Sequence, residues 1–243
     1  MPSFHSLSQL LLQPREDQLL VSWSRERAFC WADFRQDVAR VASALSTFPA
    51  AQAATRCALF TESAYWFAVA LLAALQAQKS VMLLPNAQPQ TLAEIPEQDL
   101  LLTDLPALRA NAAVLDVCTL NAGAGASSYR FQVLDADRCG VDIYTSGSTG
   151  EARCVHKTLA NFDAEVAVLE QLWGLLLSAE HRVLASVSHQ HVYGVLFRVL
   201  WPLCAGRAFA AQLIEYPEQI APFRGQPVVL VSSPALLKRI VDD

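Results

Sequence analysis

A short run of small and hydroxyl-bearing residues, Thr145-Ser146-Gly147-Ser148-Thr149-Gly150, has the composition of a phosphate-binding loop. Glycines let the backbone curl so that several N–H groups face one anion. Hydroxyl groups add donors, and the guanidinium of Arg153 supplies positive charge with paired hydrogen bonds. The run follows a largely apolar, strand-like segment, residues 141–145. These residue types in this order indicate a cradle for a polyphosphate.

A plain turn is the alternative interpretation of this run. Serine- and glycine-rich hexapeptides are often no more than turns between other elements. The pattern of the mononucleotide P-loop, G-x-x-x-x-G-K-[ST], does not occur in the chain. A phosphate site here would therefore belong to a different class of nucleotide-binding protein.

The bulk composition bounds the class of protein. The chain has 243 residues, 53% hydrophobic and 17% charged, which is enough to bury a large core in one large domain or two small ones. Its net charge is −5 and it has no basic run, so nothing in it indicates nucleic-acid binding. Its six cysteines are scattered without a C-x-x-C pattern, which favours buried thiols in a reducing compartment over zinc ligands.

Nothing in the chain has the pattern of a targeting or membrane-spanning segment. Residues 1–14 lack the basic start and apolar core of a secretory signal. The most apolar stretch, residues 66–75, is too short to span a bilayer and is predicted to be a buried helix. We therefore expect a cytoplasmic protein with no membrane span.

Hydrophobic periodicity predicts alternating strands and helices. Helical spacing of apolar residues predicts helices over residues 34–45, 63–77, 162–173 (after a cap at Thr158 or Asn161), 195–203 and 234–241. Short apolar runs predict strands over residues 19–23, 28–31, 57–61, 80–84, 100–103, 113–117, 141–145, 182–187, 207–211 and 227–231. The pattern implies an α/β fold of layered, largely parallel sheets with flanking helices, in which ligands gather at the carboxyl ends of strands. The Ala/Gly/Ser-rich stretch 121–128 is predicted to be a loop between two layers of this fold.

The segment from Tyr144 to Gly150, with a basic residue at 153, closely resembles the phosphate-loop signature of the adenylate-forming superfamily, [YF]-T-S-G-[ST]-T-G-x-P-K-G-V. That superfamily includes acyl- and aryl-CoA synthetases, adenylation domains of nonribosomal peptide synthetases, and luciferases. Residues 29–45, 56–84, 189–194 and 227–241 are similar, in order, to further segments of the family. The likeness covers the whole chain but only the family's first half, so it implies a partial N-terminal AMP-binding domain over residues 1–243.

Three positions after the loop depart from the family's usual residues. Ala152 stands where proline is usual, Arg153 where lysine is usual, and Cys154 where glycine is usual. Arginine keeps the charge and offers a fork of donors, so phosphate binding is expected to survive. His189 and Gln190 stand where an aromatic residue often precedes the motif histidine, so the pocket wall is expected to differ from the family's.

The resemblance implies activation of a fatty or aryl carboxylic acid by ATP, which forms an acyl-adenylate, and then transfer to the thiol of coenzyme A or of a pantetheine arm. Residues 145–150 would hold the β- and γ-phosphates, Arg153 would neutralise them, and Mg²⁺ would bridge them. His191, Tyr193 and Gly194, which match the family's F-H-x-[YF]-G segment, would line the acyl pocket. A solvated arginine and ordinary packing of the histidine and tyrosine remain open alternatives.

The resemblance leaves the catalytic residues and the metal ligands unassigned. The family's adenine, ribose, hinge and lysine-bearing elements do not appear before Asp243, so we expect residues 1–243 to be a fragment without turnover of its own. The expected partners are a small carboxylic acid and, if pantetheine is the acceptor, an acyl carrier protein.

Two alternative functions remain open. One is an amino-acid adenylation domain, which would carry a later aspartate for the substrate ammonium. The other is a non-catalytic nucleotide- or acyl-binding module.

Overall fold

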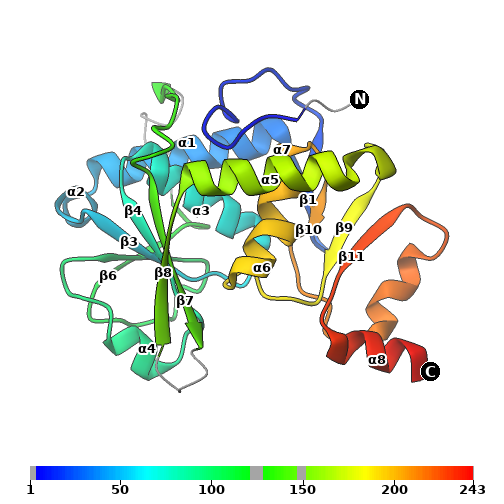
Figure 1. Cartoon of the computed structure of the whole chain (residues 1–243). Helices are drawn as coiled ribbons and strands as arrows, with labels where there is room; N and C mark the ends of the chain where they lie inside the picture. Colours follow the sequence, from blue (N-terminus) through cyan, green and yellow to red (C-terminus); the bar gives the residue numbers. More distant parts are fainter. Residues whose placement is uncertain (1–3, 121–127, 147–151, 243) are drawn as a thin grey trace.

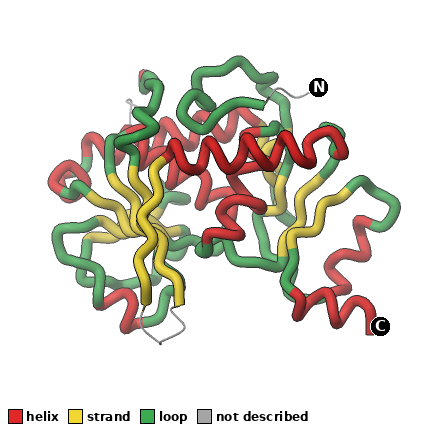
Figure 2. The backbone as a smooth tube through the Cα atoms, in the orientation of Figure 1, coloured by secondary structure: helices red, strands yellow, loops and turns green. Residues whose placement is uncertain are grey.

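Two β-sheets lie on either side of a layer of helices (Figures 1 and 2). The computed structural model describes residues 4–120, 128–146 and 152–242. Neighbouring strands pair in parallel, except in the hairpins β1–β2 and β7–β8. The predicted α/β fold of layered, largely parallel sheets is thereby confirmed.

The larger sheet has the strand order β6-β5-β3-β4-β7-β8. Its strands are β3 (Arg56–Leu59), β4 (Ser80–Leu83), β5 (Leu100–Thr103), β6 (Ala113–Asp116), β7 (Gly140–Ser146) and β8 (Ala152–Thr158). Both faces of this sheet are covered, because Cys57 and Leu59 point into the main core while Ala58, between them, packs into a second cluster with Met82 and Leu101.

The smaller sheet has the strand order β11-β9-β10-β1-β2. Its strands are β1 (Leu20–Trp23), β2 (Ala28–Cys30), β9 (Arg182–Ala185), β10 (Phe209–Ala210) and β11 (Val228–Val231). Val183 and Phe209 join the main core, whereas Leu184 and Ala210 pack on the other face with Leu236.

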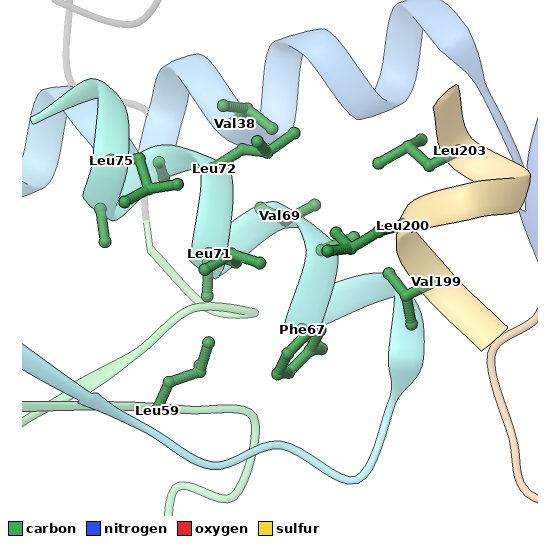
Figure 3. Packing of buried hydrophobic residues seen from close by; sticks show 14 of the residues in the cluster. Val38, Leu59, Phe67, Val69, Leu71, Leu72, Leu75, Val199, Leu200 and Leu203 are labelled. Atoms are coloured by element: carbon green, nitrogen blue, oxygen red, sulfur yellow. The ribbon is translucent and has the colours of Figure 1, made fainter. Parts of the chain in front are cut away.

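The helices of the central layer are the amphipathic α1 and the almost wholly apolar α3. The helical elements are α1 (Trp31–Thr47), α2 (Pro49–Ala53), α3 (Ala64–Gln76), α4 (Pro89–Ala93), α5 (Leu159–Trp173), η2 (Gly174–Leu176), α6 (Val192–Gly194), the π-helical η3 (Val195–Leu200), α7 (Trp201–Cys204), η4 (Pro217–Phe223) and α8 (Pro234–Asp242). Figure 3 shows side chains of α3 meeting Val38 of α1 on one side and Leu200 and Leu203 on another. An apolar helix of this kind is stable only when it is covered on every face.

Three local features differ from the sequence-based expectations. Residues 152–158 form a strand that the residue pattern did not predict, since β8 exists only through its pairing with β7. The predicted helix at 195–203 begins earlier, at Val192, and runs through η3 to Cys204. Arg40 of the amphipathic α1, a charged residue of a type that is usually exposed, is nearly buried and donates to the carbonyl oxygens of Val117 and Leu120.

Two further expectations concern a loop and the membrane. The predicted loop at 121–128 lies outside the described residues except for Ser128. Among the helices that the structure describes, none combines the length and apolar character needed to cross a bilayer.

Truncation of α3 tests the central role of its packing. We expect Leu72→Ala to lower the free energy of unfolding by about 2–5 kcal/mol, because Leu72 is fully buried among helices and strands. Leu175→Ala is the matched control, since that leucine is 96% exposed and its loss should change stability by less than about 0.5 kcal/mol. Urea unfolding of both variants measures the difference, and equal effects would contradict the packing described above.

Candidate functional site

The hairpin β7–β8 carries the candidate phosphate loop. β7 lies parallel to β4, so its carboxyl end lies at the same sheet edge as the ends of β3, β4 and β5. The antiparallel register pairs Thr145 with Arg153 and Ser146 with Ala152. Of the predicted loop residues, Gly147, Ser148, Thr149 and Gly150 lie outside the described residues. The backbones of Ser146 and Ala152 therefore mark the points at which the chain leaves and re-enters the sheet.

Side chains on β8 hold the hairpin to its surroundings. His156 Nδ1 lies 2.7 Å from Asp142 Oδ1 across the two strands. Lys157 forms a close ion pair with Glu165 of α5. At the end of β8, Thr158 is the N-cap of α5, because its hydroxyl accepts from the N–H of Asn161 at 3.3 Å while the Asn161 side chain accepts from the N–H of Thr158 at 2.9 Å.

A cleft of about 800 Å³ opens where strands of both sheets end. Its lining comes mainly from segments that follow the carboxyl ends of strands, and it consists of Ser24, Arg25, Glu26, Arg27, Phe29, Phe60, Thr61, Glu62, Ser63, Trp66, Asp104, Ser188, His189, Gln190, Arg198, Ala211, Gln212, Leu213, Glu215 and Gln219. The carboxyl edge of parallel strands is where α/β proteins bind ligands. The cleft and the hairpin loop thus both lie at carboxyl ends of strands of the larger sheet.

Four buried polar residues form what we call the cleft floor: Thr61, His189, Gln190 and Arg198. The carbonyl oxygen of Thr61 accepts from His189 Nε2 and from the Gln190 side-chain amide, both at 2.9 Å. The His189 ring also packs on Phe67, with ring centroids 4.8 Å apart. Burial, and then the Arg198 charge, lower the pKa of His189 to about 3, so the ring is neutral at pH 7. With Nε2 as the donor, Nδ1 is left as an acceptor.

The predicted acyl-pocket residues lie in a different setting from the cleft floor. His191 is exposed and Tyr193 is 45% exposed, and neither belongs to the lining of the cleft. The Tyr193 ring packs on Phe197, with centroids 4.8 Å apart. Gly194 is buried, and a Cβ atom there would lie 2.0 Å from the carbonyl oxygen of Ser188. Glycine at this position is therefore needed for α6 to pack against the segment that carries His189.

The residue pattern did not indicate Thr61 or Arg198 as members of a site, and it indicated Gln190, with His189, only as a departure from the family's pocket segment. The one signal available for Arg198 is its position inside the apolar segment Val195–Leu200, where a charge is unexpected. Gln190 and Thr61 carry no such signal, since their burial depends on the approach of segments far apart in the chain. Within the described residues, no group of three or more His, Cys, Asp or Glu side chains is arranged to hold a metal ion.

The chain is a layered α/β domain with a cleft and the end of the hairpin β7–β8 at the carboxyl edge of its larger sheet. The family model described as AMP-binding enzyme matches residues 11–242, and the chain belongs to this family. No significant match is found among curated proteins.

Solved structures of similar fold include MatB, a coenzyme A synthetase and a nonribosomal peptide synthetase. Apo MatB from Rhodopseudomonas palustris is 18% identical with a TM-score of 0.81, over 99% of this chain and 52% of that one. The o-succinylbenzoate coenzyme A synthetase MenE from Bacillus subtilis, in complex with AMP, is 17% identical with a TM-score of 0.76, over 99% of this chain and 64% of that one. AB3403, a four-domain nonribosomal peptide synthetase bound to AMP and glycine, is 19% identical with a TM-score of 0.74, over 98% of this chain and 18% of that one. The chain spans about half the length of MatB.

The burial of His189 predicts a pH dependence of stability. Its pKa is about 3 in the folded chain against an ordinary 6.5, so the unfolded chain takes up the proton first as the pH falls. The stability that depends on the neutral ring is fully present above pH 6.5 and is lost as the pH falls towards 3, by about 1.4 kcal/mol per pH unit. Urea unfolding between these pH values measures the slope.

His189→Gln removes the titrating group and should flatten that slope. His191→Gln, which removes an exposed histidine two residues away, is the matched control and should keep the wild-type slope. A His189→Gln variant with the wild-type pH dependence would show that this histidine is not the group responsible.

Proposed function

We propose that the chain is part of an enzyme that uses ATP to activate a carboxylic acid, fatty or aryl, as an acyl-adenylate. The observation that carries the proposal is the loop between Thr145 and Arg153, which follows a parallel strand at the carboxyl edge of the larger sheet. Membership of the AMP-binding enzyme family supports it, as does the similarity in fold to a coenzyme A synthetase that binds AMP. We place the enzyme in the cytoplasm, where ATP is available and the chain's free cysteines stay reduced.

The proposed chemistry makes a poor leaving group into a good one. A carboxylate is a weak acylating agent because oxide would have to leave. One carboxylate oxygen attacks the α-phosphorus of ATP, the bond to the β-phosphate bridge breaks, and pyrophosphate leaves with its electron pair. This step needs in-line alignment and stabilisation of charge on the phosphates more than it needs acid–base catalysis.

In this proposal, Thr145, Ser146, Gly147, Ser148, Thr149 and Gly150 hold the β- and γ-phosphates through backbone N–H groups and hydroxyls. Arg153 neutralises the phosphates. The register supports that role, because it places Arg153 directly across from Thr145, at the start of the loop.

Mg²⁺ is the cation that we propose for this ATP chemistry, where it would offset the negative charge of the phosphates. The described residues provide no cluster of carboxylates to hold it, so we assign it no protein ligand here. We propose coenzyme A or a carrier-protein pantetheine arm as the thiol that then displaces AMP from the adenylate, and an acyl carrier protein as partner in the second case.

For the acid itself we propose contacts with the segment at the start of α6. His191 and Tyr193 are exposed there, and Gly194 allows the close approach of this segment to Ser188. Their assignment rests on the match of residues 191–194 to the family's pocket segment.

Two alternatives lead to different experimental results. An amino-acid adenylation domain is the first, and the similarity in fold to AB3403 keeps it in view. A non-catalytic nucleotide- or acyl-binding module is the second. The kind of acid that supports exchange of pyrophosphate into ATP distinguishes an amino-acid adenylation domain from the main proposal. Ligand binding without such exchange would identify a non-catalytic module.

Exchange of labelled pyrophosphate into ATP tests the proposal. We expect the whole protein to catalyse exchange that depends on a fatty or aryl acid, and we expect residues 1–243 alone to show none. Arg153→Ala should raise the KM for ATP at least about tenfold, because a charge-assisted contact to phosphate is lost. Arg138→Ala is the matched control, since this exposed arginine precedes β7 at the opposite edge of the sheet.

Absence of exchange with fatty, aryl and amino acids alike would overturn the enzymatic proposal. Unchanged ATP kinetics in Arg153→Ala would remove the role given to that residue. Exchange with amino acids alone would favour the adenylation-domain alternative.

A further inference from the structure

Arg198 is a buried charge on the cleft floor that has no acidic partner in the described part of the chain. Its side chain is only 1% exposed. Nη1 donates to the carbonyl oxygen of Val187 at 3.2 Å, and Nη2 donates to that of Ala211 at 3.0 Å. Among the described residues, no ion pair includes Arg198, and none supplies a partner for its Nε–H group.

A buried guanidinium of this kind is costly unless an opposite charge compensates it. Burial lowers the pKa of Arg198 to about 10, which still leaves the side chain charged at neutral pH. The carbonyl oxygens of Val187 and Ala211 contribute only partial negative charge. The adjoining cleft is the place from which a full negative charge could reach Arg198.

The rest of the cleft floor limits the charge of what could bind. His189 is neutral, so Arg198 is the only positive charge on the floor. His189 Nδ1 and Gln190 Oε1 are buried acceptor atoms without donors among the described residues. The positive charge and free Nε–H donor of Arg198 suit a single anionic group of small size, and the two free acceptor atoms require a donor that a carboxylate does not supply.

The lining outside the cleft floor argues against a polyanion. Its charged residues are four acids and two arginines, namely Glu26, Glu62, Asp104, Glu215, Arg25 and Arg27. Arg27 is also engaged, because it donates to Asp33 at 3.2 Å. This excess of acids repels a nucleotide or phosphate more strongly than a singly charged ligand.

Apolar side chains of the cleft lining provide surface for the body of a ligand. Phe29, Phe60, Trp66 and Leu213 all line the cleft. A ligand with one negative charge and an aromatic or alkyl body would match both parts of the cleft, with its charge at the floor and its body against these side chains.

We propose that the cleft binds a small organic acid whose carboxylate pairs with Arg198. The site needs neither ATP nor turnover, so this inference goes beyond the proposed function and can succeed or fail independently of it. The bound acid is either the acid that the enzyme activates or a separate acid that binds without being activated. The same chemistry recognises both, and kinetics can separate them.

Titration of the chain with benzoate, followed by NMR of the arginine Nε–H groups and by tryptophan fluorescence, to which Trp66 of the cleft contributes, tests the proposal. We expect saturable binding in the millimolar range, with a shift of the Arg198 Nε–H signal. Benzamide, which has the same ring without the charge, should bind at least about tenfold more weakly. Inorganic phosphate should not compete with benzoate at equal concentration.

Substitutions locate the charge that binds the acid. Arg198→Met should weaken benzoate binding at least about tenfold, whereas Arg25→Met, which removes an exposed arginine of the same cleft, should change it by less than about threefold. Arg198→Met should fold, because an apolar side chain of similar length removes a desolvation cost, and urea unfolding checks this. If that variant does not fold, Arg198→Lys keeps the charge and should retain weakened benzoate binding.

Three results would overturn the proposal: no saturable binding of benzoate, equal binding of benzoate and benzamide, or wild-type affinity in a folded Arg198→Met variant. A raised KM for the acid in pyrophosphate exchange by Arg198→Met would identify the bound acid as the one that is activated. An unchanged KM together with lost binding would identify a separate acid. Failure of exchange in the wild type with intact benzoate binding would count against the proposed function alone.

Discussion

Helix α3 imposes the constraint on which the rest of the structure depends. Its residues are apolar on every face, and nearly all of them are buried, so the helix is stable only where other elements cover it completely. Strands β3 to β5 cover one side, α1 another, and η3 approaches from the smaller sheet (Figure 3). The first backbone N–H of the helix, that of Ala64, donates to the carbonyl oxygen of Ala211 just after β10, at 2.8 Å. The helix thereby connects the two sheets at their carboxyl ends.

The cleft lies at the beginning of this helix, and its floor shares hydrogen bonds with the connection between the sheets. The Thr61 carbonyl, just before α3, accepts from His189 and Gln190, which follow β9. The Ala211 carbonyl accepts from Ala64 and also from Arg198. The polar groups available to a ligand are therefore the same groups that hold the ends of strands from different sheets. Buried hydrogen-bond networks are stable when every donor and acceptor has a partner. The cleft floor differs from such a network because His189 Nδ1, Gln190 Oε1 and Arg198 Nε have no partner among the described residues.

The hairpin that carries the phosphate loop is held differently, at the edge of its sheet. Its exposed pair His156–Asp142 contributes little to stability. The stronger connection runs through α5, which Thr158 caps and which extends across the molecule towards the smaller sheet (Figure 1). There Glu170 accepts from Arg207 and from the Trp201 indole, both at 2.7 Å. A continuous set of contacts thus joins the hairpin to the helix and strands beside the cleft.

The residue pattern alone determined the class of fold and the character of the loop. The spacing of apolar residues predicted α3, β4, β5 and β7 within one or two residues of their observed bounds, because a run that is buried on both sides has few other ways to satisfy its backbone. The composition of residues 144–150 indicated the family to which the chain belongs. Both are local properties of the chain, so they can be read without knowledge of the packing.

Only the tertiary structure decided which polar residues meet. His189 and Gln190 became buried while His191, one residue further, stayed exposed, because Thr61 approaches from a segment more than a hundred residues away in the chain. β8 formed because β7 offered it an edge to pair with, and its own sequence carried no such signal. The sequence already shows that Arg198 lies inside an apolar segment. Its position beside a cleft, however, follows from the way in which the two sheets meet. Burial and partnership depend on distant segments, and the periodicity of a single segment contains no information about them.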